Sequence, residues 1–271
     1  MALPTPSADT TALVTGASSG IGVELARQLA ARGHGVTLVA RRADKLEELA
    51  TELRSVGVRA EVIGADLSDR SQRAELPERV GELDLNVSIL ANNAGLSTFG
   101  SVASADPDAE MNMVEVNVTA LVDLTTRFLP AMVQRGSGAI LNVASTASFQ
   151  PLPGQAGYAA TKAFVLSYTR SLGGELRGTG VSATALCPGP VHTGFADAAG
   201  ISADEAEGSL PSFMWETAQA VAKCGLDALE KGHPVAIPGP ANRVAAMAAH
   251  LTPKQLLVPI LASRHPGLKR D

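Results

Sequence analysis

The sequence predicts an α/β fold in which seven parallel strands form one doubly wound sheet within a single domain. Short β-branched runs alternate with longer segments of helical periodicity, the pattern of repeated strand–helix–strand units. Runs such as Ile89–Ala91 and Ala139–Leu141 are apolar at every position, as expected of strands covered by helices on both faces. A chain of 271 residues, 45% hydrophobic and 18% charged, is long enough to bury the core of such a fold.

Each strand and helix is predicted from its own run of residues. Strands are expected at Thr11–Thr15, Gly35–Arg41, Val58–Gly64, Leu85–Ala91, Gly138–Val143, Val181–Leu186 and Val235–Ile237. Helices are expected at Ile21–Arg32, Asp44–Val56, Ser71–Gly81, Pro107–Gln134, Gly157–Arg177 and Glu216–Lys231. Residues 1–10 predict a flexible arm, residues 11–240 the doubly wound domain with a substrate loop at about 190–215, and residues 241–271 a helical extension packed on that domain.

Composition and charge argue against several classes of function. The formal net charge is −5, and an acidic surface has little attraction for a nucleic-acid backbone. The two cysteines are too few for a disulfide framework, and the five histidines lack the spacing of metal ligands. We find no export signal and no apolar run of membrane-spanning length. We therefore expect a cytoplasmic protein without a metal ion and without nucleic-acid or membrane partners.

A glycine-rich loop, Thr15–Gly22, follows the first predicted strand directly and leads into a helix. Glycine there permits a tight turn and lets the backbone approach a pyrophosphate, whose charge lies at the positive end of the helix. The loop predicts a Rossmann-like dinucleotide site made by Gly16, Ser18, Ser19, Gly20, Ile21 and Gly22. A glycine-rich turn without a ligand is the alternative.

The end of the second predicted strand bears on the choice of dinucleotide. A cofactor with a free ribose diol usually meets an acidic residue there, but this chain reads Ala40-Arg41-Arg42. Two guanidinium groups suit a 2′-phosphate, so we predict NADP(H), with Arg41 as the stronger candidate. The alternative is that both arginines only begin a solvated helix, where positive charge is mildly unfavourable.

A tyrosine and a lysine lie four residues apart at the start of the helix that follows the fifth predicted strand. This spacing puts Tyr158 and Lys162 on one helical face. A nearby ammonium favours the phenolate, so we expect the pKa of Tyr158 to fall towards neutrality, where a phenol is useful for proton transfer. Ser145 lies just past the fifth strand, where its hydroxyl can hydrogen-bond a carbonyl oxygen. Alone, such a Tyr–Lys pair is common on helix surfaces.

With these motifs in this order, the sequence resembles the classical branch of the short-chain dehydrogenase/reductase family from about Thr11 to Gly239. The glycine loop is similar to the family's TGxxxGxG element, and Asn92–Gly95 is similar to its NNAG element. The resemblance implies a catalytic set of Asn117, Ser145, Tyr158 and Lys162. It also implies cofactor contacts from Asp66, Leu67, Asn93, Ala94, Gly95, Tyr158, Lys162, Pro188, Gly189, Val191 and Thr193.

The resemblance further implies a mechanism. Tyr158 gives a proton to the substrate oxygen as hydride arrives from the nicotinamide, and Ser145 steadies that oxygen. Lys162 binds the nicotinamide ribose and lowers the pKa of the phenol, while Asn117 holds a water on the proton path. A homodimer or homotetramer built on the helices of Asn117 and Tyr158 is expected. The alternative function is a regulatory protein that senses NADP without turnover.

Most of the nine aromatic residues fall near the expected substrate side, at the carboxyl ends of the later strands. These residues predict an apolar pocket lined by Phe99, Phe149, Phe195, Phe213 and Trp215; closing the core beneath the loops is the alternative. No Lys or Arg occurs at 97–126, 136–161 or 178–222, so an anionic substrate finds no partner there. We expect a neutral, apolar ketone, aldehyde or secondary alcohol, with residues 196–211 as a lid or as an ordered surface loop.

Overall fold

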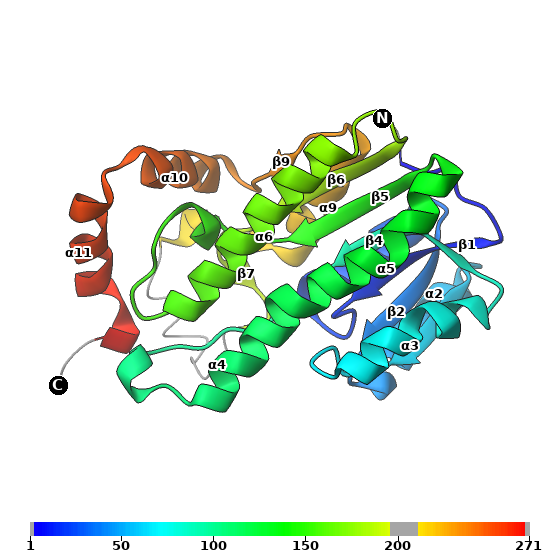
Figure 1. The fold of residues 1–271 in the computed structure, drawn as a ribbon, viewed down its shortest axis with the longest axis horizontal. Coiled ribbons are helices and arrows are strands. Elements are labelled where there is room, and N and C mark those ends of the chain that lie inside the picture. Colours follow the sequence, from blue (N-terminus) through cyan, green and yellow to red (C-terminus); the bar gives the residue numbers. More distant parts are fainter. Residues whose placement is uncertain (1–2, 196–210, 269–271) are drawn as a thin grey trace.

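The computed structural model describes residues 3–195 and 211–268 and confirms the predicted fold. Seven parallel strands form one sheet in the order β3-β2-β1-β4-β5-β6-β9, with helices on both faces (Figure 1). The strands are β1 (Thr10–Thr15), β2 (Gly35–Ala40), β3 (Ala60–Gly64), β4 (Asn86–Asn92), β5 (Gly138–Val143), β6 (Val181–Leu186) and β9 (Val235–Ala236). The order reverses between β1 and β4, and ligands of open parallel sheets bind at such a switch point.

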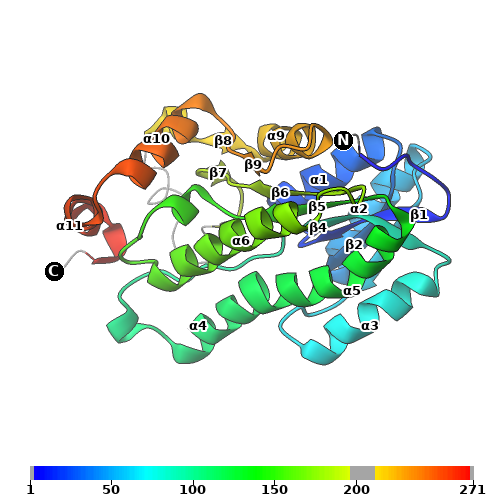
Figure 2. The same ribbon diagram turned by 45° about the horizontal axis from the view of Figure 1, so that its top comes forward.

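The helices pack in two layers. They are α1 (Gly20–Ala31), α2 (Ala43–Ser55), α3 (Arg70–Gly81), α4 (Pro107–Val114), α5 (Ala120–Arg135), α6 (Ala156–Glu175), α9 (Ala218–Glu230), α10 (Pro240–Leu251) and α11 (Lys254–Arg264). In Figure 2, α1 and α9 lie on one side of the sheet and α3, α5 and α6 on the other. Apart from the helix discussed next, the predicted elements match within two residues, the usual uncertainty at element ends.

Both faces of the sheet are buried under helices. On β1, Val14 packs into the core cluster of α1, α2 and α9, whereas Leu13 faces the cluster of α3, α5 and α6. Both side chains are fully buried. This double burial explains why the strands are apolar at successive positions instead of alternating.

The predicted helix Pro107–Gln134 is present within one residue of its predicted ends, but it is not one regular α-helix. A π turn at Glu115–Thr119 separates α4 from α5. The extra residue of the turn accompanies burial of the Asn117 amide, which bonds to neighbouring segments as described below. Apolar periodicity carries no signal for such an insertion, because the residues on either side keep helical spacing.

The last residues of the described chain form an extension at the edge of the molecule. Helix α10 packs against two short 3₁₀ helices, Thr146–Phe149 and Ser212–Met214. Figure 1 shows α10 and then α11 leading away from β9. A second sheet that the sequence analysis missed pairs β7 (Val191–His192) with β8 (Glu216–Thr217).

At the other end of the chain, residues 3–9 lie against the domain. Leu3 packs on the core cluster that includes α1, and the Asn86 N–H donates to the Asp9 carbonyl oxygen at 2.8 Å. Within residues 3–195 and 211–268, no helix combines the length and apolar composition that crossing a bilayer requires.

Candidate active site

The glycine loop packs backbone against backbone. Gly16 has φ +65°, and a Cβ there would lie 2.9 Å from Ala94 Cα. A Cβ on Gly22 would lie 2.3 Å from the Gly16 carbonyl oxygen, and one on Gly20, with φ +56°, would lie 2.9 Å from Thr193 Cγ2. Larger residues do not fit, so the loops after β1, β4 and β6 meet in one glycine-lined cradle. Ser19 begins α1 in extended backbone beside it.

Thr15 joins two of these loops. Its hydroxyl oxygen accepts from the N–H groups of Asn93 at 2.9 Å and Ala94 at 3.0 Å. The Asn93 side-chain amide donates to the Thr15 carbonyl oxygen at 2.9 Å. In the sequence, Thr15 is recognisable only as the first residue of the glycine loop. Its place just before Gly16, on a strand next to the one that leads into Asn92–Gly95, could have indicated that its hydroxyl joins the two loops.

The two arginines at the end of β2 lie differently. Arg42 turns to the glycine loop, where its Nη2 donates to Ser18 Oγ at 3.0 Å and to the Ser18 carbonyl oxygen at 3.3 Å. Arg41 is exposed. Beyond β3, Asp66 Oδ1 accepts from the N–H of Ser68 at 2.9 Å and from its hydroxyl at 2.8 Å. The edge of the cradle therefore carries the Arg42 guanidinium and one oriented carboxylate, with the exposed Arg41 next to Arg42 in the chain.

Tyr158, Ser145 and Lys162 come together where β5 ends and α6 begins. The Tyr158 hydroxyl lies close enough to Ser145 for the serine hydroxyl to affect its pKa. Lys162 Nζ lies 5.8 Å from the centre of the Tyr158 ring and donates to the Val143 carbonyl oxygen at 2.9 Å. Ser145 also accepts from the Ala147 N–H at 3.1 Å, which fixes its hydroxyl at the start of a 3₁₀ helix.

Burial dominates the acid–base behaviour of this group. Burial of the Tyr158 hydroxyl raises the pKa of the phenol above its usual value, and the nearby Ser145 hydroxyl only partly opposes this. Burial lowers the pKa of Lys162 to about 8. The prediction that the pKa of Tyr158 falls is therefore wrong: in this structure the pKa is raised. A sequence pattern reveals the neighbouring charge but not the cost of desolvating both groups.

Asn117 belongs to the same constellation. A Cβ on Gly95 would lie 3.2 Å from Lys162 Nζ and 3.3 Å from Asn117 Oδ1. The Asn117 amide donates to the Leu96 carbonyl oxygen at 2.9 Å and to Thr161 Oγ1 at 3.0 Å, and its Oδ1 accepts from the Leu96 N–H at 2.8 Å. These bonds fasten the π turn to the loop after β4.

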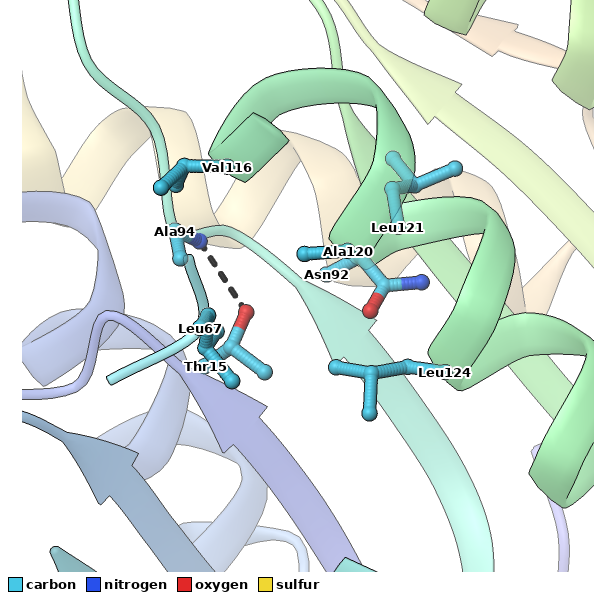
Figure 3. Close-up of a pocket in the computed structure, with 8 residues that line it drawn as sticks. All are labelled: Thr15, Leu67, Asn92, Ala94, Val116, Ala120, Leu121 and Leu124. Atoms are coloured by element: carbon cyan, nitrogen blue, oxygen red, sulfur yellow. Dashed lines mark hydrogen bonds between the residues drawn. The ribbon is translucent and has the colours of Figure 1, made fainter. Parts of the chain in front are cut away.

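A small cavity lies behind the π turn (Figure 3). Eight residues line it: Thr15, Leu67, Asn92, Ala94, Val116, Ala120, Leu121 and Leu124. Asn92 Oδ1 is buried without a hydrogen-bond partner among the described residues, and it points into this space. Packing on this side of the turn is thus incomplete, and polar contacts hold the turn in place.

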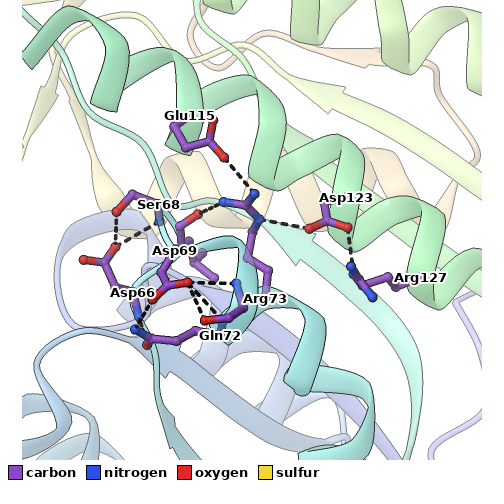
Figure 4. A network of polar contacts seen from close by, with 10 residues as sticks. Asp66, Ser68, Asp69, Gln72, Arg73, Glu115, Asp123 and Arg127 are labelled. Atoms are coloured by element: carbon purple, nitrogen blue, oxygen red, sulfur yellow. Dashed lines mark hydrogen bonds and ion pairs between the residues drawn. The ribbon is translucent and has the colours of Figure 1, made fainter. Parts of the chain in front are cut away.

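Arg73 supplies one of those contacts and was missed by the sequence analysis. Its side chain is 1% exposed, and its guanidinium pairs with Glu115 at 2.7 Å and Asp123 at 3.0 Å (Figure 4). It also donates to the Leu67 carbonyl oxygen at 2.6 Å. One buried cation therefore connects the loop after β3 with the start of the π turn and with α5. The sequence predicts only that Arg73 lies in the helix Ser71–Gly81, which does not indicate a buried ion-pair network.

The predicted substrate residues do not form one cluster. Phe195 is the one whose ring meets Tyr158, with centroids 6.0 Å apart. Phe99 packs against His265 and Phe149 against His250, both in the C-terminal extension. Phe213 is 71% exposed, and Trp215 packs against His192. The predicted lid at 196–211, with its short helix, lies almost wholly outside the described residues.

Three of the remaining predicted cofactor residues lie beside the cradle. The Pro188 carbonyl oxygen accepts from the Thr146 N–H at 2.8 Å, and Val191 enters β7. Asn242 Oδ1 would lie 2.4 Å from a Cβ on Gly189, so α10 holds this loop closely. Burial raises the pKa of the nearby Cys187 to about 12, as expected of a packed thiol.

A family model described as short chain dehydrogenase matches residues 10–203. The chain therefore belongs to the short-chain dehydrogenase/reductase family, as its fold and the grouping of Ser145, Tyr158 and Lys162 indicate.

Curated relatives resemble the chain over about two thirds of its length. A putative ketoacyl reductase of Streptomyces coelicolor is 39% identical over 184 residues, 67% of this chain and 70% of that protein. A short chain dehydrogenase of Pseudocercospora fijiensis is 38% identical over 186 residues, 68% of this chain. The match spans only 60% of that fungal protein.

Solved structures resemble the chain over most of its length. A short-chain dehydrogenase of Sphingobium yanoikuyae in complex with NADPH is 34% identical, with a TM-score of 0.79 over 92% of this chain and 95% of that one. A bulky-bulky ketone specific alcohol dehydrogenase of Comamonas testosteroni is 30% identical, with a TM-score of 0.74 over 96% and 95%. A Burkholderia phymatum relative in complex with NAD is 26% identical, with a TM-score of 0.79 over 89% and 92%.

Proposed function

We propose that the protein is an NADPH-dependent reductase of neutral, apolar ketones or aldehydes, reversible as an alcohol dehydrogenase. The observation that carries the proposal is the meeting of Ser145, Tyr158, Lys162 and Asn117 beside a glycine-lined cradle at the switch point of the sheet. A phenol, a hydroxyl and an ammonium in one place suit proton transfer to a carbonyl oxygen.

The cradle suits a dinucleotide. Its three glycines let the loops after β1, β4 and β6 approach more closely than any Cβ would allow, at the start of helix α1 where backbone N–H groups attract phosphate. When bound, NADPH supplies the hydride. We propose that Gly16, Ser18, Ser19, Gly20, Ile21 and Gly22 hold its phosphates, while Asp66, Leu67, Asn93, Ala94 and Gly95 lie along it. Pro188, Gly189, Val191 and Thr193 would hold the nicotinamide end.

The protein's own residues then act on the substrate oxygen. Tyr158 donates its proton, and its raised pKa keeps the phenol protonated at neutral pH. Ser145 donates a hydrogen bond to the same oxygen. Lys162 orients the ribose and stabilises the phenolate that remains. Because the Asn117 side chain is already bonded to Leu96 and Thr161, its proposed role is to fix the π turn, whose backbone carbonyls would hold the water on the proton path.

The preference for NADP(H) rests on the arginines of the β2 end. Arg42 is anchored on Ser18, and exposed Arg41 is the guanidinium available to a 2′-phosphate. Arg41→Ala should raise the Kd for NADPH about tenfold and leave that for NADH unchanged, since a charge-assisted contact contributes about 1.5–3 kcal/mol. Fluorescence titration with both dinucleotides measures this. An unchanged ratio of the two Kd values would assign the recognition elsewhere.

An apolar substrate is supported by the absence of Lys and Arg from residues 97–126, 136–161 and 178–222. The Comamonas relative is named for bulky ketones, which agrees with this choice. The Streptomyces relative is named a putative ketoacyl reductase, so acyl thioesters must be compared directly. Faster reduction of an acyl-carrier substrate than of every neutral ketone would overturn the proposed substrate class.

The test of the reaction itself uses two tyrosines of the same helix. NADPH consumption is measured with a panel of neutral ketones and aldehydes for the wild type, Tyr158→Phe and Tyr168→Phe. Tyr158→Phe should lose about 10²–10⁴-fold in kcat/KM while binding NADPH normally. Tyr168→Phe, which loses only a hydroxyl that bonds Thr125, should stay active. An active Tyr158→Phe contradicts the mechanism, and NADPH binding without turnover of any substrate would favour the sensor.

The assembly and location of the protein are part of the proposal as well. We propose a homodimer or homotetramer in the cytoplasm, built on the helices that carry Asn117 and Tyr158.

A further inference from the structure

Charge is divided unevenly along the chain. Residues 231–270 contain six Lys or Arg and no Asp or Glu. Residues 1–230 hold the other 16 basic residues and 26 acidic ones, and Asp271 ends the sequence. An acidic body is thus followed by a basic segment, and that segment includes both helices of the extension. A strong charge asymmetry of this kind is typical of chains that meet a charged surface.

The same segment leaves its apolar side chains uncovered. Helix α11 reads KQLLVPILASR, and none of its described side chains is buried. Leu256 is 63% and Ile260 51% exposed. A helix that is apolar on nearly every side is stable when something covers it, because each exposed leucine or isoleucine leaves apolar surface in water.

Helix α10 also leaves apolar side chains exposed. Val244, Met247 and Leu251 are 68%, 59% and 78% exposed, and their spacing places them on one side of the helix. The other side, with Ala246 and Asn242, is buried against the domain. In Figures 1 and 2, α11 lies at the margin of the molecule, outside the layers of the sheet. The exposed side chains therefore face away from the core.

We propose that α10 and α11 bind the surface of an anionic lipid bilayer. Their five exposed apolar side chains enter the boundary between headgroups and acyl chains, and Arg243 and Lys254, exposed basic residues of the same two helices, attract the lipid phosphates. Apolar side chains combined with Lys and Arg, and free of acidic groups, are the composition of interfacial helices. The expectation of no membrane partner rested on spanning segments and export signals, and interfacial binding requires neither.

The alternative partner for the exposed apolar surface of α10 and α11 is a second copy of the chain. Two copies joined through this surface would bring two sets of basic side chains together with no acidic group in 231–270 to separate them. The like charges of such a self-complementary contact repel each other. An anionic bilayer has the opposite charge and an apolar layer beneath it, so it satisfies both features of the segment.

Vesicle flotation of the full chain tests the proposal. Vesicles of phosphatidylcholine with one quarter phosphatidylglycerol are compared with vesicles of phosphatidylcholine alone. We expect binding to the anionic vesicles only. Binding should weaken as salt rises from about 0.1 M to about 1 M, because the screening length falls from about 10 Å to about 3 Å. The measurement needs no turnover, so its result is independent of the proposed reductase activity.

Variants test whether the apolar side chains of α11 cause the vesicle binding or whether any exposed apolar residue does. Leu256→Gln combined with Ile260→Gln should reduce the bound fraction about tenfold, since both side chains lose their apolar surface. Val56→Gln is the matched control, because Val56 is 74% exposed at the end of α2, far along the chain from the extension. Both variants replace exposed residues outside the candidate active site, so ketone reduction in solution should be unchanged.

Two outcomes would overturn the proposal. Equal vesicle binding by the double variant and the wild type would show that α11 is not the contact. Failure of the wild type to bind anionic vesicles, together with a smaller oligomer for the double variant in sedimentation velocity, would assign the surface to a second copy of the chain.

Discussion

The proposed cofactor side and the proposed substrate side of the candidate site are crowded to a similar degree but by different atoms. At the cofactor side, a Cβ on Gly22 would meet the Gly16 carbonyl oxygen at 2.3 Å. At the substrate side, a Cβ on Gly267 would meet the Phe99 ring at 2.7 Å. A backbone oxygen fixed by a strand and a helix cannot move away, whereas a ring can turn. The cofactor side is therefore rigid and the substrate side adaptable.

The polar contacts of Arg73 and His265 follow the same division, although Asn92 Oδ1 on the cofactor side is also without a partner among the described residues. At the cofactor side, buried Arg73 has three hydrogen-bonded or ion-paired neighbours. At the substrate side, His265 is 8% exposed, and its Nδ1 has no partner among the described residues. Satisfied networks specify one arrangement, whereas an unsatisfied group permits others. This contrast predicts where substitutions are severe.

The largest effect is expected for Arg73→Met. Removing a guanidinium that is 1% exposed takes the Arg73 partner from Glu115 and from the Leu67 carbonyl and leaves Asp123 paired only with Arg127. Breaking a buried pair costs about 3–5 kcal/mol, so the free energy of unfolding should fall by about that amount. Urea denaturation measures it. Arg127→Met is the control, because Arg127 is 31% exposed and pairs with the same Asp123.

The control should lose no more than about 1 kcal/mol, as solvent-exposed ion pairs do. Equal losses for the two arginines would mean that the network of Figure 4 does not stabilise the fold. It would also remove the proposed difference between the two sides of the site.

Gly22→Ala tests the rigid glycine loop directly. The methyl group and the Gly16 carbonyl oxygen cannot occupy the same space, and overpacking of this kind costs about 1–3 kcal/mol. The Kd for NADPH should rise about 10–100-fold, measured by fluorescence titration. Gly174→Ala on α6 meets nothing within 4 Å and should bind NADPH normally. Normal NADPH binding by Gly22→Ala would show that the glycine loop moves to make room for the methyl group, as a flexible side chain would.

How much the sequence predicts differs between local patterns and contacts that join distant parts of the chain. The glycine loop, Asn93 and the Tyr158–Lys162 pair are local patterns, and the structure brings them together as their order on parallel strands requires. The contacts of Arg73, the π turn at Asn117 and the packing of His265 on Phe99 join residues far apart in the chain. No local periodicity encodes such contacts, so the fold was predictable but the support of the site was not.

The pH dependence of reduction tests the electrostatics of the catalytic group. Burial lowers the pKa of Lys162 to about 8, below its usual 10.5, so its ammonium is lost as pH rises through about 8. Tyr158 keeps its proton in this range because its pKa is raised. The reductive kcat/KM should be level below pH 8 and fall about tenfold per pH unit above it. Initial rates of NADPH oxidation between pH 6 and 9.5 measure this.

Lys162→Met serves as the control for that profile. It should be slow at every pH and show no step near pH 8, because it lacks the titrating ammonium. A wild-type profile that stays level up to pH 9.5 would mean that the charge of Lys162 does not contribute to the rate.

The smallest effect is expected for Gly267→Ala, which repeats the glycine substitution on the adaptable side. The methyl group meets the ring of Phe99 at 2.7 Å and Gly100 Cα at 3.2 Å, and the ring can turn at a cost of about 0.5–1.5 kcal/mol. The Kd for NADPH should not change, and KM for a bulky ketone should change less than about tenfold, the ratio that about 1.4 kcal/mol represents. Steady-state kinetics with a small and a bulky ketone separate the two readouts. If Gly267→Ala weakened NADPH binding as strongly as Gly22→Ala, the C-terminal extension would be as rigid as the glycine loop. Movement of Phe99 would then have to be transmitted to the cradle, and the two sides of the site would act as one body.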